Sequence, residues 1–217
     1  MIRLRRLAHK KNGLTCNTEV KKVSHPYSYW AQFIIWLFLI GNMFNFITWN
    51  VLGLTKDFKR SLLANDCSRY GMDIVCLQET KCTAAEDIML HNKYRLIILE
   101  QKHCRHGGLG FVISPRMQNY LKSYSYVSDR VAILNLLIPT KSGIPTHYRI
   151  VNAYGPTMQR ATNDPQLVAN FYSALSRAID VPSRHEVYIL GDFNSKLGKV
   201  SRDELMETNI SYHVGRY

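Results

Sequence analysis

The sequence predicts an α/β fold in which mixed β-sheets carry helices on their outer faces. From Asn45 onwards, short apolar runs rich in β-branched residues alternate with stretches of helical character, which is typical of α/β domains. Several later runs follow one another without a helix between them, and this order indicates a meander within the same fold. The chain of 217 residues, 46% of them hydrophobic, is long enough for one domain with a substantial core.

The first elements alternate between strand and helix. We expect strands at 46–50, 73–79 and 94–100, with helical stretches at 56–70 and 84–91 between them. Each expected strand is an apolar run bounded by turn-forming residues.

The later elements open with the meander and close with a helix and a strand. The expected meander comprises strands at 108–113, 121–127, 130–138 and 147–154. A helix is expected at 163–179, because Asp164 and Pro165 suit its cap and first position. A last strand follows at 187–192.

The net charge of +12 favours an anionic partner. Residues 1–45 hold seven Lys or Arg and one acid, Glu19, so residues 46–217 carry the remaining +6. A basic body suits a polyphosphate such as nucleic acid, because each neutralised phosphate releases counterions. Charge alone does not distinguish nucleic acid from an anionic membrane, and a basic surface also serves solubility.

Residues 1–44 differ from the rest of the chain and are expected to be an extension outside the fold. Residues 1–22 are basic and polar, and the block Trp30–Ile40 is nearly all apolar. This block of about 11 residues is shorter than the roughly 20 that a membrane helix needs, so stable membrane insertion is not expected. Three interpretations stay open: a membrane-associated helix, an extra helix docked on the domain, or a non-native extension of the reading frame.

Four apolar runs lead to polar residues that suit a metal ion or a phosphate. The run FITWN brings Asn50, DIVCLQET brings Glu79, YRIVNAYGPT brings Tyr154, and VYILGDFN brings Asp192 and Asn194. One strand that ends on a polar residue carries little information. Four that end on acids, amides and a phenol indicate one site at a common edge of the sheets. Such a set fits metal-assisted attack on a phosphate ester.

Glu79 is the candidate metal ligand. It ends a run too apolar to hold an unpaired carboxylate without a large cost. A hard cation such as Mg²⁺ would satisfy it together with water and a substrate phosphate. An Arg or Lys partner at the sheet edge would satisfy it equally well.

Asp192 and Asn194 flank one residue, so in an extended chain both side chains point to the same side. An acid and an amide there can orient a water or a metal and donate to a phosphate oxygen. An Asx turn after the strand would use the same residues. Tyr154 precedes a Gly-Pro turn that would hold its phenol as a donor, and Asn50 alone could be a turn residue.

Five motifs in a fixed order resemble the endonuclease/exonuclease/phosphatase superfamily: ITWNVLGL, DIVCLQETK, GGLGFVIS, YRIVNAYGPT and VYILGDFNSKLG. The likeness covers about residues 45–217. It is greatest to the apurinic-endonuclease-like domain of non-LTR retrotransposons and to the craniofacial development protein 2-like proteins derived from them. The resemblance implies a DNase I-like four-layer α/β sandwich, in which two mixed sheets pack face to face with helices outside.

The resemblance also implies a role for each candidate residue. Glu79 would be the Mg²⁺ ligand, with Mn²⁺ as a substitute, and Asn50 and Asp192 would lie at the same metal. Asp192 would also orient or activate the attacking water. Asn194 and Tyr154 would hold the substrate phosphate and complete the catalytic set with Asp192.

The chain departs from the family pattern at two places. Related repair nucleases often carry an acid two residues after the first Asn, where this chain has Leu52. The later strands of the family normally supply a further Asp and a terminal Asp-His pair, and His213 stands too early to replace that His. We therefore expect the domain, residues 45–217, to be incomplete at its C-terminus, with a hydrophobic sheet edge exposed.

The resulting hypothesis is a Mg²⁺-dependent endonuclease domain of retrotransposon ancestry that acts on DNA and is impaired by loss of the Asp-His pair. One alternative is a catalytically inactive fragment that only binds nucleic acid or a partner. Another is a small-substrate phosphatase of the same superfamily. Five cysteines, an odd number, indicate reduced thiols and an intracellular protein. A nuclear location suits a DNA substrate, while the apolar block leaves membrane association open.

Overall fold

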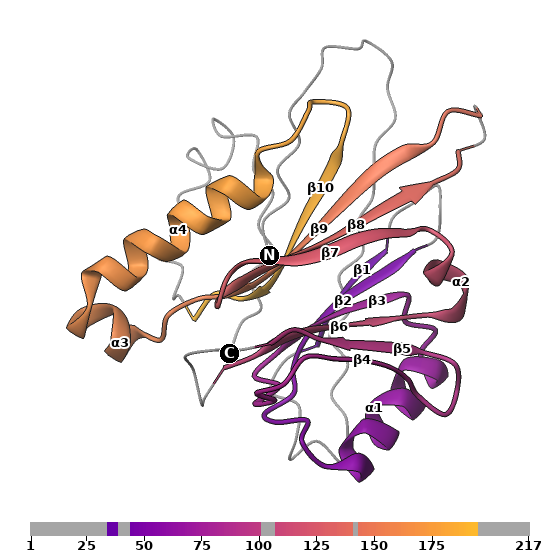
Figure 1. Ribbon diagram of the computed structural model, residues 1–217, viewed down its shortest axis with the longest axis horizontal. Coiled ribbons are helices and arrows are strands. Elements are labelled where there is room, and N and C mark those ends of the chain that lie inside the picture. Colours follow the sequence, from indigo (N-terminus) through magenta and orange to yellow (C-terminus); the bar gives the residue numbers. More distant parts are fainter. Residues whose placement is uncertain (1–33, 39–43, 101–106, 141–142, 195–217) are drawn as a thin grey trace, which may run out of the picture.

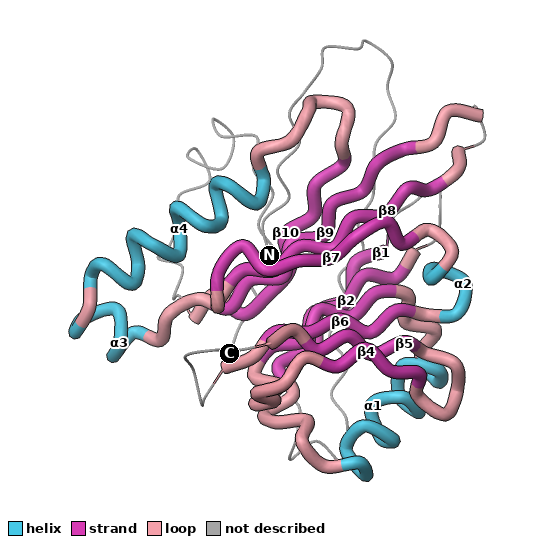
Figure 2. Tube along the Cα trace, in the orientation of Figure 1, coloured by secondary structure: helices cyan, strands magenta, loops and turns pink. Residues whose placement is uncertain are grey.

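The computed structural model describes residues 34–38, 44–100, 107–140 and 143–194. These residues form two β-sheets that pack face to face, with helices on the outer faces (Figures 1 and 2). The predicted α/β sandwich is therefore confirmed. The expected lack of later strands concerns residues after Asn194, which lie outside the described residues.

The first sheet contains six strands. In spatial order they are β1 (Ile34–Phe38), β2 (Asn45–Asn50), β3 (Ile74–Gln78), β6 (Leu109–Ile113), β5 (Arg95–Ile98) and β4 (Glu86–Met89). β2 and β3 are parallel, and all the other neighbours are antiparallel. The crossover between β2 and β3 is helix α1 (Asp57–Arg69), and the short helix α2 (Pro115–Gln118) follows β6.

The second sheet contains four strands. In spatial order they are β10 (Glu186–Asp192), β9 (Thr146–Tyr154), β8 (Val131–Ile138) and β7 (Leu121–Ser128). Between β9 and β10 the chain forms helices α3 (Met158–Asn163) and α4 (Pro165–Ile179). α4 begins as predicted, because the Asp164 carboxylate caps it by accepting a 3.1 Å hydrogen bond from the Leu167 amide.

Three apolar layers hold the sandwich together. Phe46 belongs to the layer between the two sheets. Ile47, the next residue, points to the opposite face of β2 and packs in the layer that contains Leu63 of α1. Val151 of β9 and Phe171 of α4 belong to the third layer, outside the second sheet. Figure 1 accordingly shows α1 beside the first sheet and α3 and α4 beside the second.

Residues 84–91, predicted to be helical, contain strand β4 instead. β4 pairs antiparallel with β5, and charged partners fix its two acids. Arg60 of α1 donates to both carboxylate oxygens of Glu86 at 2.7 Å, and Arg95 binds Asp87 in the same way. Helix propensity is a weak preference, and tertiary contacts of this kind override it.

Residues 34–38 fall within the segment expected to be an extension, residues 1–44. They form β1 and pair antiparallel with β2 at the edge of the first sheet. Their sequence IIWLF is rich in β-branched and aromatic residues, which suit a strand. The remainder of the extension, up to residue 43, lies outside the described residues. No helix in the described part of the chain is long and apolar enough to cross a membrane.

Candidate active site

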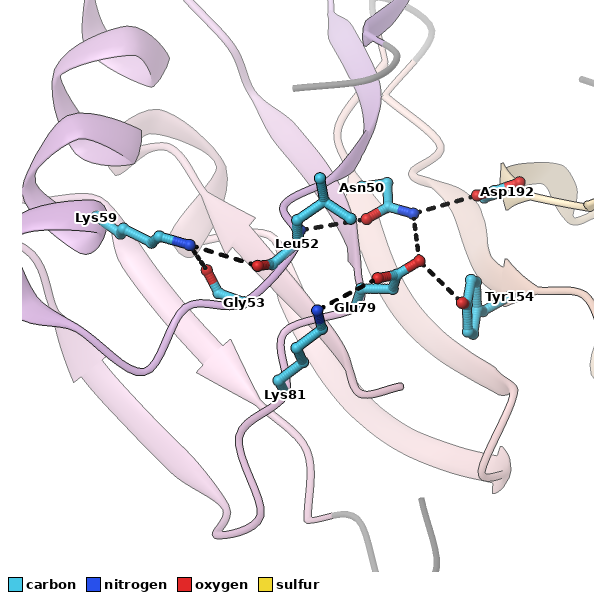
Figure 3. A network of polar contacts seen from close by, with 8 residues as sticks. All are labelled: Asn50, Leu52, Gly53, Lys59, Glu79, Lys81, Tyr154 and Asp192. Atoms are coloured by element: carbon cyan, nitrogen blue, oxygen red, sulfur yellow. Dashed lines mark hydrogen bonds and ion pairs between the residues drawn. The ribbon is translucent and has the colours of Figure 1, made fainter. Parts of the chain in front are cut away.

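Four of the five candidate residues form one hydrogen-bonded network where strands of both sheets end (Figure 3). Asn50 Nδ2 donates to Glu79 Oε1 at 2.8 Å and to Asp192 Oδ2 at 3.2 Å. The Tyr154 hydroxyl donates to the same Glu79 oxygen at 2.9 Å. Asn50 and Glu79 come from the first sheet, and Tyr154 and Asp192 come from the second, so the network joins the two sheets.

Parallel strand pairing brings these residues to the same edge. In the first sheet Asn50 lies opposite Gln78, so Glu79 follows directly beside it. In the second sheet Asp192 lies opposite Tyr154. The carboxyl ends of parallel strands meet at one edge of a sheet. Asn50 therefore lies next to Glu79, and Tyr154 lies next to Asp192.

Asn194 joins the site through an Asx turn, one of the two arrangements considered from the sequence. Its backbone amide donates to Asp192 Oδ1 at 3.0 Å, and its side-chain amide donates to the Gly155 carbonyl at 2.9 Å. The residue has a φ of 49°, a left-handed conformation that Asn tolerates better than most residues. The chain is therefore not extended here, and the Asn194 side chain is turned to the loop after β9 rather than to Glu79.

Two glycines let the β9 and β10 ends approach closely. A Cβ atom at Gly155 would lie 2.3 Å from the Phe193 carbonyl oxygen. One at Gly191 would lie 1.9 Å from the Ala153 carbonyl oxygen. Any side chain at either position would therefore displace the backbone that carries the site residues.

Backbone strain is concentrated in the loops of the first sheet that border the site. Leu52, Glu79 and Lys81 all have left-handed backbones, with φ values of 48°, 54° and 56°. Such conformations cost of order 1–3 kcal/mol each and persist only where the surroundings fix them. Here the Gly53 amide donates a 2.6 Å hydrogen bond to the Glu79 carbonyl, which ties the two loops together.

One lysine faces the carboxylate of Glu79, and a second binds the neighbouring loop. Lys81 Nζ lies 3.8 Å from Glu79 Oε2, the oxygen that faces away from Asn50 and Tyr154 in Figure 3. Lys59 Nζ donates to the carbonyls of Leu52 and Gly53 at 3.3 and 3.1 Å. The lysine partner considered from the sequence is thus present, at a distance longer than a hydrogen bond.

Tyr154 is held as a neutral hydrogen-bond donor. Burial raises the pKa of its phenol, and so do the hydrogen bond to Glu79 and the negative charges of Glu79 and Asp192. The Arg130 guanidinium, 5.4 Å from the ring centroid, lowers that pKa but does not outweigh them. Arg130 also donates to the carbonyls of Tyr154 and Gly155 at 3.1 and 3.2 Å. The sequence prediction missed Arg130, which precedes β8 in a turn and carries no local signal.

Comparison with protein families gives a match over most of the chain. A model of the Endonuclease/Exonuclease/phosphatase family matches residues 47–208. The chain belongs to this family. The match covers most of the chain and includes all five candidate residues, so the predicted resemblance is confirmed at the level of the family. No curated protein sequence matches the chain significantly.

Solved structures share the family fold. The APE2 catalytic domain of Xenopus laevis matches with a TM-score of 0.52 and 16% identity, over 74% of this chain and 63% of that one. The AP endonuclease LMAP from Leishmania major matches with a TM-score of 0.51 and 19% identity, over 69% and 54%. An AP endonuclease from Archaeoglobus fulgidus gives 0.50 and 17%, over 75% and 63%. At these identities the likeness concerns the fold alone, and the chain spans only 54–63% of the length of these structures.

The donor set fits the divalent metal ions on which the endonuclease/exonuclease/phosphatase family generally depends. Glu79 and Asp192 offer carboxylate oxygens, and one or two carboxylates with water and phosphate are the usual surroundings of Mg²⁺. Asn50 faces both carboxylates with its Nδ2 donor, so it orients the two acids in this arrangement. Across the described ranges, no group of three or more His, Cys, Asp or Glu side chains could hold a metal ion.

Proposed function

We propose that this chain is a Mg²⁺-dependent phosphodiester hydrolase that acts on DNA, an endonuclease domain of retrotransposon ancestry. The observation that carries the proposal is the network in which Asn50 bridges Glu79 and Asp192 while Tyr154 donates to Glu79. Two carboxylates held close together by donors, at the meeting edge of two sheets, favour a cation between them. Family membership supports phosphate-ester chemistry at this edge.

Each side chain would have a distinct task in hydrolysis. Glu79 and Asp192 would hold Mg²⁺, which when bound polarises a phosphate oxygen and stabilises the developing negative charge. Asp192 would also orient the attacking water, as its resemblance to the family implies. Asn50 would keep the two carboxylates aligned. Tyr154, whose raised pKa keeps the phenol protonated even at alkaline pH, would donate a hydrogen bond toward the phosphate or toward Glu79.

Asn194 would contact the substrate phosphate, as the resemblance implies, but only after a change of partner. Its side-chain amide donates to the Gly155 carbonyl, and that bond would have to open for the amide to reach a phosphate oxygen. The Asx turn places Asn194 beside Asp192, and a rotation of its side chain would be needed to redirect it. The observed bond therefore describes a resting arrangement in this proposal.

Charge favours DNA over a small phosphorylated substrate. The net charge of +12 is shared between residues 1–45 and residues 46–217. Lys81 stands at the site itself, and Lys59 is bonded to the Leu52 and Gly53 carbonyls beside it. Phosphate backbones are bound by such cations with release of counterions. The fold likeness to AP endonucleases agrees with this choice, and a DNA substrate would place the protein in the nucleus.

The test is nicking of supercoiled plasmid DNA by the full chain with Mg²⁺ or Mn²⁺. We expect Glu79→Gln to reduce nicking at least about 100-fold, because loss of even a residue that supports a metal ligand costs 10–100-fold. The matched control is Glu186→Gln. Glu186 is the first residue of β10 and Asp192 is the last, so Glu186 lies at the far end of the strand from the site. Equal nicking by wild type and Glu79→Gln would contradict the proposal.

Two other outcomes would support the alternative functions. Salt-sensitive DNA binding without any nicking would support a fragment that only binds DNA. Hydrolysis confined to small phosphomonoesters would support a small-substrate phosphatase.

A further inference from the structure

A layer of buried polar side chains lies directly beneath the site. Thr48, Gln78 and Asn152 have exposed fractions of only 4%, 1% and 0%. Elsewhere the space between the sheets is filled by a large apolar cluster. Burying an amide or a hydroxyl is unfavourable unless it is hydrogen-bonded, so three of them in one place require an explanation.

The three side chains form a chain of hydrogen bonds from the first sheet to the second. Thr48 Oγ1 donates to Gln78 Oε1 at 3.1 Å. Gln78 Nε2 donates to Asn152 Oδ1 at 2.7 Å and to the Cys76 carbonyl at 3.0 Å. Since Gln78 belongs to β3 and Asn152 to β9, the 2.7 Å bond crosses between the sheets.

Asn152 anchors the chain of bonds to the first sheet a second time. Its Nδ2 donates to the Leu77 carbonyl at 2.9 Å and to the Gly110 carbonyl at 3.0 Å. These carbonyls belong to the adjacent strands β3 and β6. Both amide hydrogens of Asn152 are therefore directed at two neighbouring strands of the opposite sheet, which fixes β9 in two directions.

Each member of this layer stands next to a site residue on its own strand. Thr48 precedes Asn50 by two positions, and Asn152 precedes Tyr154 by two, so each pair shares a face of its strand. Gln78 directly precedes Glu79. The two sheets are thus joined by side-chain hydrogen bonds twice: once in the site and once in the buried layer beneath it.

We propose that Thr48, Gln78 and Asn152 are positioning residues that fix the alignment of the two sheets beneath the site. Apolar packing is non-directional, whereas hydrogen bonds weaken steeply with distance and angle. The layer therefore resists a slide of one sheet over the other that apolar packing would permit. Without it, only the hydrogen bonds of the site itself would hold the Tyr154 hydroxyl at the Glu79 carboxylate. The inference rests on the proposed function, because the groups it positions are the proposed metal ligand and its donor.

The test compares the full chain with a Gln78→Met/Asn152→Leu double variant. This change replaces both amides by apolar side chains of related shape and removes both partners of the 2.7 Å bond between the sheets. It also takes a hydrogen-bond partner from the Thr48 hydroxyl and from the carbonyls of Cys76, Leu77 and Gly110. Each single variant instead leaves an amide unpaired in the core and should lower the thermal midpoint by roughly 2–4 °C or more. Asn135→Leu is the matched control, because Asn135 bonds Ser123 and Arg149 and takes no part in the layer.

We expect the double variant to remain folded, as its cooperative thermal transition will show, while its dissociation constant for Mn²⁺, measured by calorimetry, rises about tenfold or more, as for lost support of a metal ligand. Asn135→Leu should bind Mn²⁺ like the wild type. A double variant with wild-type affinity would overturn the positioning role alone. A wild-type chain that binds no Mn²⁺ would overturn the proposed function and this inference with it.

Thr48→Val decides the matter if the double variant does not fold. It keeps the shape of the side chain and removes only the hydrogen bond to Gln78. The thermal midpoint should fall by roughly 2–4 °C, because the Gln78 Oε1 acceptor loses its donor. Weaker Mn²⁺ binding by the folded variant would support the positioning role. Unchanged affinity would overturn it.

Discussion

The Tyr154 hydroxyl donates a 2.9 Å hydrogen bond to Glu79 Oε1, although the two residues stand 75 positions apart and belong to different sheets. The same oxygen accepts the Asn50 amide. With two donors on Oε1, the carboxylate is held with its other oxygen toward Lys81. The orientation of the proposed metal ligand therefore depends on the second sheet.

Replacement of Tyr154 by Phe should separate the role of this bond from that of the ring. Tyr154→Phe removes one net hydrogen bond, worth about 1 kcal/mol of stability, and releases Glu79 from the second sheet. We expect nicking of plasmid DNA at saturating Mg²⁺ to fall about 10–100-fold, the range for residues that orient a metal ligand.

Tyr124→Phe is the control for this change. The Tyr124 hydroxyl donates to Asp87 at 2.7 Å, so the substitution also removes a bond from a phenol to a carboxylate. We expect it to leave nicking unchanged, and an equal loss of activity in both variants would contradict the specific role of Tyr154.

The stability of the fold should decline at alkaline pH because several phenols hold their protons in the folded state. Burial is the largest cause that raises the pKa of Tyr154, and burial also raises the pKa of Tyr94 to about 12. In the unfolded chain a tyrosine titrates near about 10. The unfolded state therefore loses protons first, so this contribution to stability is complete below about pH 10 and is lost as the pH rises toward 12. Urea midpoints measured between about pH 9 and pH 11 should fall, and less steeply for Tyr94→Phe. A urea midpoint of the wild type that does not change with pH in this range would contradict the raised pKa values of these tyrosines.

The candidate site was largely predictable because its residues end apolar runs. Asn50, Glu79, Tyr154 and Asp192 each follow a segment whose periodicity marks a buried strand, and the strand ends meet once the pairing is parallel. Arg130 was not predictable, because its contacts with Tyr154 arise only from the antiparallel register of β8 and β9. That register depends on long-range pairing, which no local pattern records.

Two other features needed the structure for related reasons. Gln78 and Asn152 are visible in the sequence as polar residues inside apolar runs, but their pairing joins positions 74 apart in different sheets. Strand β4 was predicted as a helix, because local propensity says nothing of the partners that Arg60 and Arg95 provide. In both cases the deciding interaction is distant in the chain.

The ion pair between Arg60 and Glu86 should stabilise β4 measurably. The side chains are exposed by only 15% and 27%, and both guanidinium contacts are 2.7 Å long. Bidentate geometry and partial burial place such a pair at the upper end for surface ion pairs, about 1 kcal/mol. We expect Glu86→Gln to lower the free energy of unfolding by about that amount in chemical denaturation. Glu100→Gln, at an exposed acid, should have no effect, and equal losses in the two variants would contradict the assignment.

Leu52 offers a way to increase metal affinity. Its amide donates to Asn50 Oδ1 at 3.2 Å, and Figure 3 shows it beside Asn50 at the edge of the network. Its left-handed backbone, with a φ of 48°, is one that Asp and Asn adopt more readily than Leu.

Leu52→Asp should add a third carboxylate beside Glu79 and Asp192. Repulsion among the acids should lower the thermal midpoint of the metal-free variant, and Mn²⁺ should restore it, because a ligand that binds only the folded state stabilises it. We expect the dissociation constant for Mn²⁺, measured by calorimetry, to fall about tenfold, equivalent to about 1.4 kcal/mol. Leu52→Asn is the matched control, since it has the same shape and backbone preference without the charge. Equal Mn²⁺ affinity in the Asp and Asn variants would mean that position 52 does not face the metal, and would contradict this prediction.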